Sequence, residues 1–279
     1  MSTSRRSFLI SAAALGAAAA GCAAPPRGAP PRRYILVHGA WHGAWCWDKL
    51  VPLLRERGHS VDAIDLPGSG RDVANAANAT LERYVERVVQ SIDAGAGPVV
   101  LVGHSSGGAV ITGAAEVRPD RIAAAVYLAA FLPRSGSSTQ EISRSPENAG
   151  SLIPRAMIMS ADKRTVSLRP DALKEIFYAD CSDTDAAWAS SRVGPQALRP
   201  LGEKVVWTPE RFGRVRRIYI MTLRDRALAP EAQRRIVSET SFERVITMDT
   251  GHSPFLSRPQ DLDMLQREHK AHLDDACAR

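Results

Sequence analysis

Ser105 lies at the centre of the strongest chemical signal in this 279-residue sequence. Residues 103–107 read Gly-His-Ser-Ser-Gly, which matches the pattern Gly-x-Ser-x-Gly. Glycine and serine are common, so the context carries more weight than the match. An apolar run at residues 99–102 precedes the motif, and a helix-like run at residues 108–115 follows it. A strand, a sharp turn and a helix in this order lift a serine hydroxyl clear of a sheet, which predicts a nucleophile at Ser105.

A serine hydroxyl is a weak nucleophile until a base removes its proton. Of the seven histidines, His252 is the best placed, because it follows a strand predicted at residues 244–248 and precedes a final helix. That position puts it at the carboxyl edge of the sheet, where Ser105 also lies. His38 and His104 border the site but are poorly placed as the base. We interpret three others as surface residues in a turn or on the last helix: His59, His269 and His272.

The base needs a carboxylate to orient its ring and to stabilise the imidazolium. Where a serine occupies this kind of turn, the chain order is Ser, then Asp or Glu, then His. Asp225 meets that order, since it follows a strand predicted at residues 217–222 and precedes a helix at Pro230. Asp249 is the rival, but it stands only three residues before His252 and is expected to serve its own loop.

An oxyanion hole needs two backbone N–H groups. One is expected from Ser106, directly after the nucleophile, and the other from Ala40, in the loop after the first strand. The sequence contains no Cys and His cluster at zinc spacing and no dinucleotide fingerprint. We therefore expect neither a metal nor a cofactor.

Short apolar runs alternate with amphipathic segments, which indicates an α/β protein with a mostly parallel, doubly wound sheet. Strands are predicted at residues 34–37, 60–64, 99–102, 123–129, 217–222 and 244–248. Helices are predicted at residues 45–57 and from Thr80 onward, with Thr80 as the N-cap of the second helix. Residues 133–213 interrupt the alternation and predict a helical cap over the site. The aromatic residues that such a cap would present are Phe177, Tyr178, Trp188 and Trp207.

Residues 1–33 are interpreted as an export signal and a flexible tether. Arg5 and Arg6 form a twin-arginine pattern before an alanine-rich run, and residues 19–22 resemble a bacterial lipobox that ends at Cys22. We therefore predict an exported bacterial protein, either periplasmic or anchored to the membrane through a lipidated Cys22. The alternative is a chance arginine pair before an unstructured alanine stretch.

Composition and charge narrow the class of protein. With 44% hydrophobic and 24% charged residues, the chain is typical of a globular protein. Five arginines of the +6 net charge precede the first strand, so the folded part is close to neutral and no nucleic-acid partner is expected. We also expect no structural disulfide, because a lipidated Cys22 would leave an odd number of cysteines: Cys46, Cys181 and Cys277.

One longer motif points to a family. Residues 38–47 read His-Gly-Ala-Trp-His-Gly-Ala-Trp-Cys-Trp, which is much more specific than the serine motif. Together with residues 103–107 and His252, this segment resembles the plant methylesterase and hydroxynitrile lyase group of the α/β-hydrolase superfamily, and its bacterial esterase relatives. The resemblance implies one hydrolase domain over residues 34–279. It also implies the site already inferred: Ser105, Asp225 and His252 as a catalytic triad, and Ala40 and Ser106 as oxyanion donors.

Two departures from the lyases favour ester hydrolysis. The lyases of this group carry a lysine directly after the catalytic histidine and a hydroxyl residue at the position of Gly39. This chain has Ser253 and Gly39 there. The prediction is a serine carboxylic-ester hydrolase that acts on small apolar or aromatic esters through an acyl-enzyme. The alternatives are cyanohydrin cleavage by the same serine and a non-catalytic ligand-binding protein with the hydrolase fold.

Overall fold

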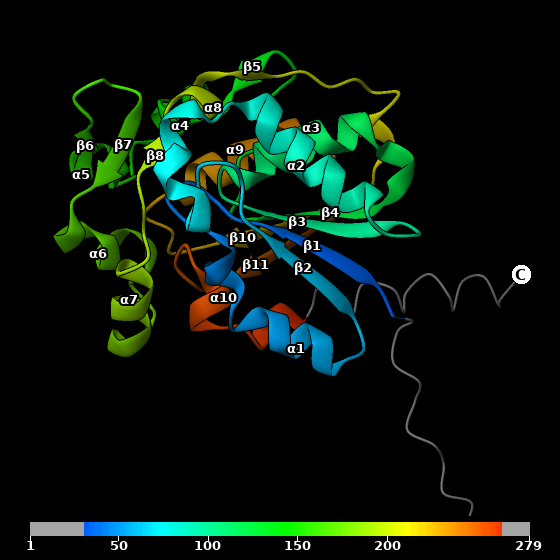
Figure 1. The fold of residues 1–279 in the computed structure, drawn as a ribbon, viewed down its shortest axis with the longest axis horizontal. Coiled ribbons are helices and arrows are strands. Elements are labelled where there is room, and N and C mark those ends of the chain that lie inside the picture. Colours follow the sequence, from blue (N-terminus) through cyan, green and yellow to red (C-terminus); the bar gives the residue numbers. More distant parts are fainter. Residues whose placement is uncertain (1–30, 264–279) are drawn as a thin grey trace, which may run out of the picture.

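The computed structural model describes residues 31–263, and its centre is a parallel sheet. Within these residues six strands pair in the order β11-β10-β4-β3-β1-β2, and every neighbouring pair is parallel (Figure 1). The predicted parallel, doubly wound sheet is confirmed. The strands are β1 (Arg33–Val37), β2 (Ser60–Ile64), β3 (Val99–His104), β4 (Ile122–Leu128), β10 (Arg217–Thr222) and β11 (Arg244–Met248).

Helices bury both faces of this sheet, which explains why its four inner strands, β1, β3, β4 and β10, are mostly apolar and buried. Side chains alternate across a strand, so Ile35 and Val37 of β1 pack into one core while Tyr34 and Leu36 pack into the other. One group of helices covers the upper face in Figure 1, and a second group covers the lower face. These are α2 (Leu81–Asp93), α3 (Gly107–Val117) and α9 (Pro230–Glu239) above, and α1 (Leu50–Glu56) and α10 (Pro254–Ser257) below.

Two helices show how the local sequence determines where a helix begins. Thr80 is the N-cap of α2 as predicted, because its Oγ1 accepts a hydrogen bond from the Arg83 backbone N–H at 3.2 Å. The helix predicted at residues 45–57 is instead a 3-10 turn (Ala44–Trp47) followed by α1. Pro52 explains the break, since it has no N–H to donate within a longer helix but is tolerated in the first turn.

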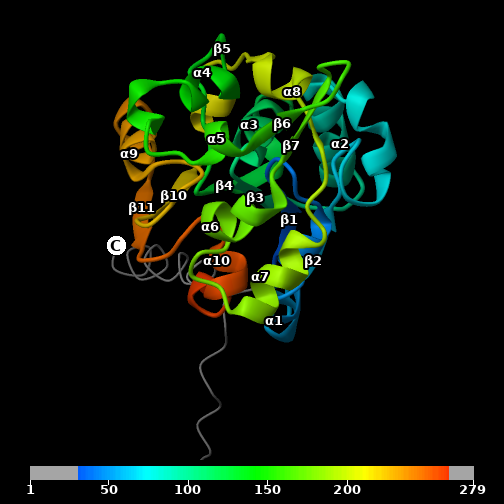
Figure 2. The same cartoon turned by 90° about the vertical axis from the view of Figure 1, so that its left-hand side faces the viewer.

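Residues 133–213, which we call the insertion, lie between β4 and β10. Figure 2 shows the insertion in front of the central sheet, at the carboxyl ends of the strands. It contains two small antiparallel sheets, β5-β9 and β6-β7-β8. Its strands are β5 (Ser137–Ser138), β6 (Met157–Met159), β7 (Thr165–Leu168), β8 (Gln196–Ala197) and β9 (Lys204–Val205). Its helices are α4 (Thr139–Ser143), α5 (Ile153–Ala156), α6 (Leu173–Phe177), α7 (Asp183–Ser190) and α8 (Arg199–Gly202).

Several predictions concern residues that the structure does not describe. The twin-arginine pattern and Cys22 lie outside the described residues, as do His269, His272 and Cys277. Across residues 31–263, every helix is too short or too polar to pass through a bilayer. Cys46 and Cys181 are free thiols.

The connection from β3 to α3 depends on close backbone packing. A Cβ on Gly107 would stand 2.6 Å from the His38 carbonyl oxygen and 2.8 Å from that of Val37. A Cβ on Gly103 would stand 2.8 Å from the Gly107 carbonyl oxygen. The glycines of the serine motif thus let α3 begin directly against β1.

Gly107→Ala tests this packing. The added methyl group meets backbone oxygens that cannot rotate away, so we expect the free energy of unfolding to fall by about 2 kcal/mol or more in urea denaturation. Gly202→Ala is the control, because its new Cβ would meet nothing closer than 3.8 Å. Equal stability of the two variants would contradict the assignment of Gly107 to a packing role.

Candidate active site

Ser105 occupies a strained turn between β3 and α3. Its φ is +52°, a left-handed conformation that non-glycine residues seldom adopt. Three backbone hydrogen bonds hold the turn: the Ser105 N–H donates to the Leu128 carbonyl at 3.2 Å, and the Ser105 carbonyl accepts from Gly108 and Phe131 at 3.0 Å each. A strain of this kind persists only where the surroundings over-determine it, and it is typical of functional sites.

His252 and Asp225 form a buried pair. His252 Nδ1 lies 2.7 Å from Asp225 Oδ2, and both side chains are almost fully buried. His252 follows β11 and Asp225 follows β10, so the carboxyl ends of neighbouring strands bring them together. Four further donors hold the carboxylate: the backbone N–H groups of Ala227 and Leu228 at 2.8 and 2.9 Å, Thr222 Oγ1 at 2.8 Å and Gln233 Nε2 at 3.2 Å.

Asp249, the rival acid, lies elsewhere. Its carboxylate is 77% exposed and 2.9 Å from the Arg224 guanidinium. The structure therefore brings Asp225, and not Asp249, to the histidine.

His104 connects His252 to the serine turn. His104 Nε2 donates to the His252 carbonyl oxygen at 2.9 Å, and the two rings lie 4.5 Å apart between centroids. Burial lowers the pKa of His104 well below its ordinary value, so the ring is neutral. Because His104 immediately precedes Ser105, this bond holds the His252 loop beside the serine.

Two more buried histidines shape the loop that contains Ala40. His38 Nδ1 donates to the Gly39 carbonyl at 2.8 Å, and its Nε2 accepts from the Leu66 N–H at 3.1 Å. His42 Nδ1 donates to the Ala40 carbonyl at 2.8 Å, and its Nε2 accepts from the Tyr178 hydroxyl at 2.8 Å. Burial lowers the pKa of His42 to about 3, so it bonds as a neutral ring.

One cavity connects the serine with both expected oxyanion donors. Ser105, Ser106 and Ala40 line a cavity of about 540 Å³. Within residues 31–263, the backbone N–H groups of Ala40 and Ser106 have no hydrogen-bond acceptor. The rest of the wall is largely apolar and includes Trp41, Phe131, Ile153, Met157, Val166 and Leu198. In the same described part of the chain, His, Cys, Asp and Glu side chains form no group that could hold a metal ion.

The aromatic residues expected to cover the site do not line this cavity. Phe177 packs against the His252 ring at 5.7 Å, and Trp188 packs against Trp45 at 5.6 Å. Trp207 donates its Nε1–H to the Pro133 carbonyl at 3.0 Å. Phe177 and Trp188 thus pack the insertion on the body, whereas Trp207 bonds within the insertion. The aromatic side chains on the cavity wall, Trp41 and Phe131, come from outside the insertion.

His59 is another correction. We expected a surface residue in a turn, but only 6% of His59 is exposed. Its Nδ1 accepts from the Arg32 backbone N–H at 3.2 Å, and its ring lies 5.1 Å from that of Tyr34. The turn between α1 and β2 folds the ring under the end of β1, which a local pattern does not reveal.

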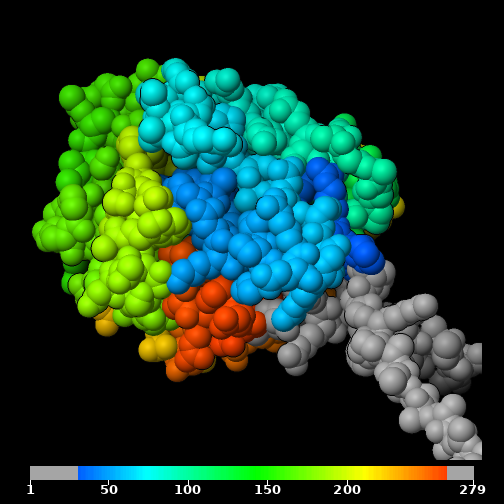
Figure 3. All heavy atoms as spheres, turned by 60° about the horizontal axis from the view of Figure 1, so that its bottom comes forward, coloured from blue at the N-terminus to red at the C-terminus, as the bar shows by residue number. Residues whose placement is uncertain are grey.

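Asp180 is a residue of the site that sequence reasoning missed. Its Oδ2 accepts from the Gly251 backbone N–H at 2.9 Å and from Ser257 Oγ at 3.0 Å, on either side of His252. Asp180 belongs to the insertion, whose α7 adjoins α1 and α10 on the face in Figure 3. Lys49 and Asp185 form an ion pair across this junction at 2.6 Å. The contact spans 71 residues of sequence, so no local signal could identify it.

Comparison with known proteins places this architecture. The model of the alpha/beta hydrolase family matches residues 34–263. Salicylic acid-binding protein 2 of Nicotiana tabacum is 35% identical over 86% of this chain and 98% of its own length. Putative methylesterase 14, a chloroplastic protein of Arabidopsis thaliana, is 33% identical over 85% of this chain and 71% of its own length. The solved structure of a pyrethroid hydrolase from Sphingobium faniae superposes with a TM-score of 0.78 and 27% identity, covering 86% of this chain and 99% of that one.

The chain therefore belongs to the alpha/beta hydrolase family. Within that family it is similar to the plant methylesterases, which confirms the resemblance inferred from the sequence. The methylesterase and hydrolase relatives support ester hydrolysis as the class of activity.

His42→Gln tests the buried neutral histidine through the pH dependence of stability. The unfolded chain protonates His42 near its ordinary pKa of 6.5, whereas the folded protein does so only near pH 3. The unfolded state therefore binds the extra proton, and the free energy of unfolding falls by about 1.4 kcal/mol per unit as the pH drops through this window. We expect His42→Gln to reduce the slope of the free energy of unfolding against pH by about 1.4 kcal/mol per pH unit, the contribution of one proton, between pH 6 and pH 4.5. Urea denaturation at several pH values measures this slope.

Tyr178→Phe is the matched control for His42→Gln. It removes the same hydrogen bond but leaves the titrating ring, so stability should fall at pH 7 while the slope is kept. A wild-type slope in His42→Gln would show that His42 is protonated in the folded protein.

Proposed function

We propose that the protein is a serine carboxylic-ester hydrolase with Ser105 as nucleophile, His252 as base and Asp225 as the acid that orients the base. The observation that carries the proposal is the shared cavity wall. The strained Ser105 lines one largely apolar cavity together with Ala40 and Ser106, whose N–H groups have no acceptor among the described residues. The His252–Asp225 pair is hydrogen-bonded next to the serine turn.

The first half-reaction acylates the serine. Ser105 Oγ forms a bond to the ester carbonyl carbon while His252 takes the hydroxyl proton. The carbonyl oxygen becomes an oxyanion, which the N–H groups of Ala40 and Ser106 stabilise. Asp225 stabilises the imidazolium and keeps the ring in the required tautomer. The carbon–oxygen bond to the alcohol then breaks, and His252 returns the proton to the departing alcohol.

The second half-reaction releases the acid. Water attacks the acyl-enzyme carbonyl as His252 removes its proton, and the same two N–H groups stabilise the second oxyanion. The bond to Ser105 Oγ breaks, and His252 returns the proton to the serine. No other group is needed to balance these steps.

The cavity supports small apolar or aromatic esters as substrates. Its volume of about 540 Å³ suits a small molecule, and Trp41, Phe131 and Val166 provide apolar contact. The methylesterase names of the relatives point to compact alcohols such as methanol.

Two observations favour hydrolysis over cyanohydrin cleavage. A Cβ at Gly39 would stand 2.6 Å from the Ser105 Cβ, so this backbone leaves no room for the hydroxyl side chain of the lyases. Ser253 stands in place of their lysine and is fully buried. A non-catalytic binding protein would be expected to lack the oxyanion donors or the buried His252–Asp225 pair, and this chain retains both.

Ser105→Ala tests the nucleophile. We expect hydrolysis of a short-chain 4-nitrophenyl ester to fall by about 10³-fold or more, because the attacking atom is lost. Labelling by a fluorophosphonate probe should disappear as well. Ser106→Ala is the control, since it keeps the backbone N–H and should retain most activity.

The same assay separates the alternatives. Retained ester hydrolysis in Ser105→Ala would overturn the proposal, and cyanide release from mandelonitrile that exceeds ester hydrolysis would favour the lyase. A wild-type protein that neither hydrolyses esters nor reacts with the probe would favour a binding protein.

Asp180→Ala tests the positioning of the His252 loop. Asp180 does not line the cavity, so we expect kcat to fall about tenfold with little change in KM. Asp180→Asn keeps an acceptor oxygen and should restore part of kcat. Asp185→Asn, which breaks a different contact between the insertion and the body, should leave kcat unchanged. A rise in KM alone would show that Asp180 acts on substrate binding instead.

A further inference from the structure

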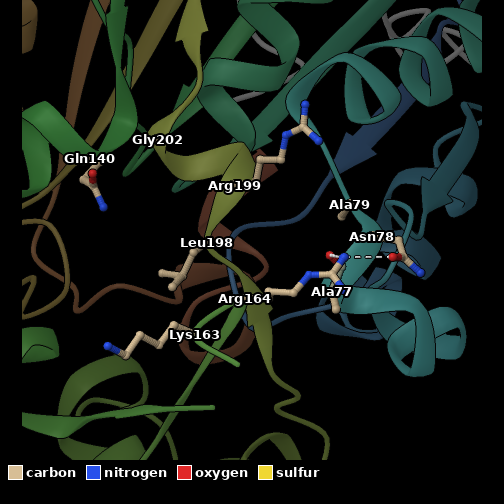
Figure 4. A pocket seen from close by; sticks show the side chains of 9 residues that line it. All are labelled: Ala77, Asn78, Ala79, Gln140, Lys163, Arg164, Leu198, Arg199 and Gly202. Carbon is tan, nitrogen blue, oxygen red and sulfur yellow. Dashed lines mark hydrogen bonds between the residues drawn. The ribbon is translucent and has the colours of Figure 1, made fainter. Parts of the chain in front are cut away.

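A second hollow adjoins the cavity above Ser105. This outer hollow has a volume of about 500 Å³ and is lined by residues 77–79, the turn between β6 and β7, α4 and α8 (Figure 4). Gln140 and Leu198 line both hollows, which therefore meet at these two side chains. A substrate too long for the inner cavity would extend past them into the outer hollow.

The outer hollow is lined by positive charge. Lys163, Arg164 and Arg199 line it, and Arg144 lines the inner cavity. Among the described residues that line either hollow there is no aspartate or glutamate. A cleft lined by charge of one sign concentrates ligands of the opposite sign.

Neighbouring acids compensate only part of this charge. Glu203 Oε1 is 2.6 Å from Arg199 Nε and pairs with it. Asp162 lies in the turn before Arg164, and its Oδ1 accepts from Ser160 Oγ at 2.7 Å and from the Arg164 backbone N–H at 3.1 Å. Its carboxylate is therefore engaged with the turn itself.

The other three cations, Arg164, Arg144 and Lys163, are free to pair with an anionic ligand. The Arg164 guanidinium donates to two neutral oxygens, the Ala77 carbonyl at 2.6 Å and Asn78 Oδ1 at 3.0 Å. Within residues 31–263, Arg144 and Lys163 form no ion pair. Figure 4 shows Arg164 and Asn78 on one side of the hollow and Gln140 on the opposite side, with Leu198 between them.

Arg144 lines the inner cavity near Gln140, the side chain that borders both hollows. It directly follows α4, and its backbone N–H donates to the Gln140 carbonyl at 3.0 Å, one helical turn back. Side chains four residues apart lie on the same side of a helix, so Arg144 and Gln140 share one side of α4.

We propose that the outer hollow, with Arg144 at its inner end, is an anion-binding subsite. The esters that this enzyme prefers carry a carboxylate or a similar anionic group at the end remote from the scissile carbonyl. The apolar part of such an ester fills the inner cavity, and its anionic end pairs with Arg144, Lys163 and Arg164. This inference rests on the proposed function, because it assumes that an ester reacts at Ser105.

The test compares anionic esters with neutral partners of nearly the same shape. The first series contains 4-nitrophenyl monoesters of linear dicarboxylic acids with four to ten carbons, each beside its methyl-capped diester. A second series places the carboxylate on the alcohol side, as acetate esters of linear ω-hydroxy acids beside their methyl-capped partners. For wild-type protein we expect kcat/KM to favour the anionic ester by about fivefold at one chain length in one series. The preference should shrink as sodium chloride is raised to 0.5 M.

Single substitutions locate the subsite. Arg144→Gln and Lys163→Gln should each reduce the anionic preference, the ratio of kcat/KM for the anionic ester to kcat/KM for its methyl-capped partner, toward one. Arg118→Gln is the matched control, because it makes the same change of charge at the amino edge of the sheet, where Arg118 pairs with Asp93. It should keep the wild-type preference.

The outcomes separate this inference from the proposed function. If the methyl-capped esters are hydrolysed and no chain length in either series shows an anionic preference, the subsite is overturned and the hydrolase stands. If the preference survives in both Arg144→Gln and Lys163→Gln, the subsite is likewise overturned. If neither ester of any pair is hydrolysed, the proposed function falls and the inference falls with it.

Discussion

The left-handed turn at Ser105 lies where the loop after β1 and the start of α3 approach closely enough that an added Cβ would clash. Gly107 lets α3 start against the carbonyl oxygens of β1, and Gly39 lets the following loop lie against the Ser105 Cβ. This approach brings Ala40 and Ser106 to the wall of the same cavity. A side chain at either glycine would separate the loop from the turn. The geometry of the site therefore requires residues without a side chain at positions 39 and 107.

Buried polar groups then hold the remaining parts in place. His38, His42 and His104 are kept neutral by burial, and each bonds a backbone carbonyl at the edge of the site. Of the four buried histidines here, His252 is the one whose ring is bonded to a carboxylate among the described residues. A carboxylate partner suits the His252 ring to proton transfer, whereas the rings bonded to backbone carbonyls hold neighbouring loops in place.

The insertion completes the site from outside the sheet. Tyr178 bonds His42 beside the loop that contains Ala40, and Asp180 bonds both sides of the His252 loop. Other parts of the insertion supply much of the apolar cavity wall and the cations of the outer hollow. In the proposed hydrolase, substrate recognition and the placement of the catalytic groups therefore depend on the same segment, and a change in its packing would affect both.

The amino-acid sequence by itself determined the parallel sheet, most element positions and the candidate residues Ser105, Asp225 and His252, because these follow from local periodicity and from motifs at strand ends. Tertiary structure alone decided that Phe177 and Trp188 pack on the body rather than on the cavity, that His59 is buried, and that Asp180 holds the His252 loop. Each of these depends on contacts between segments far apart in sequence, and no short-range pattern of residue types encodes which distant backbones will meet.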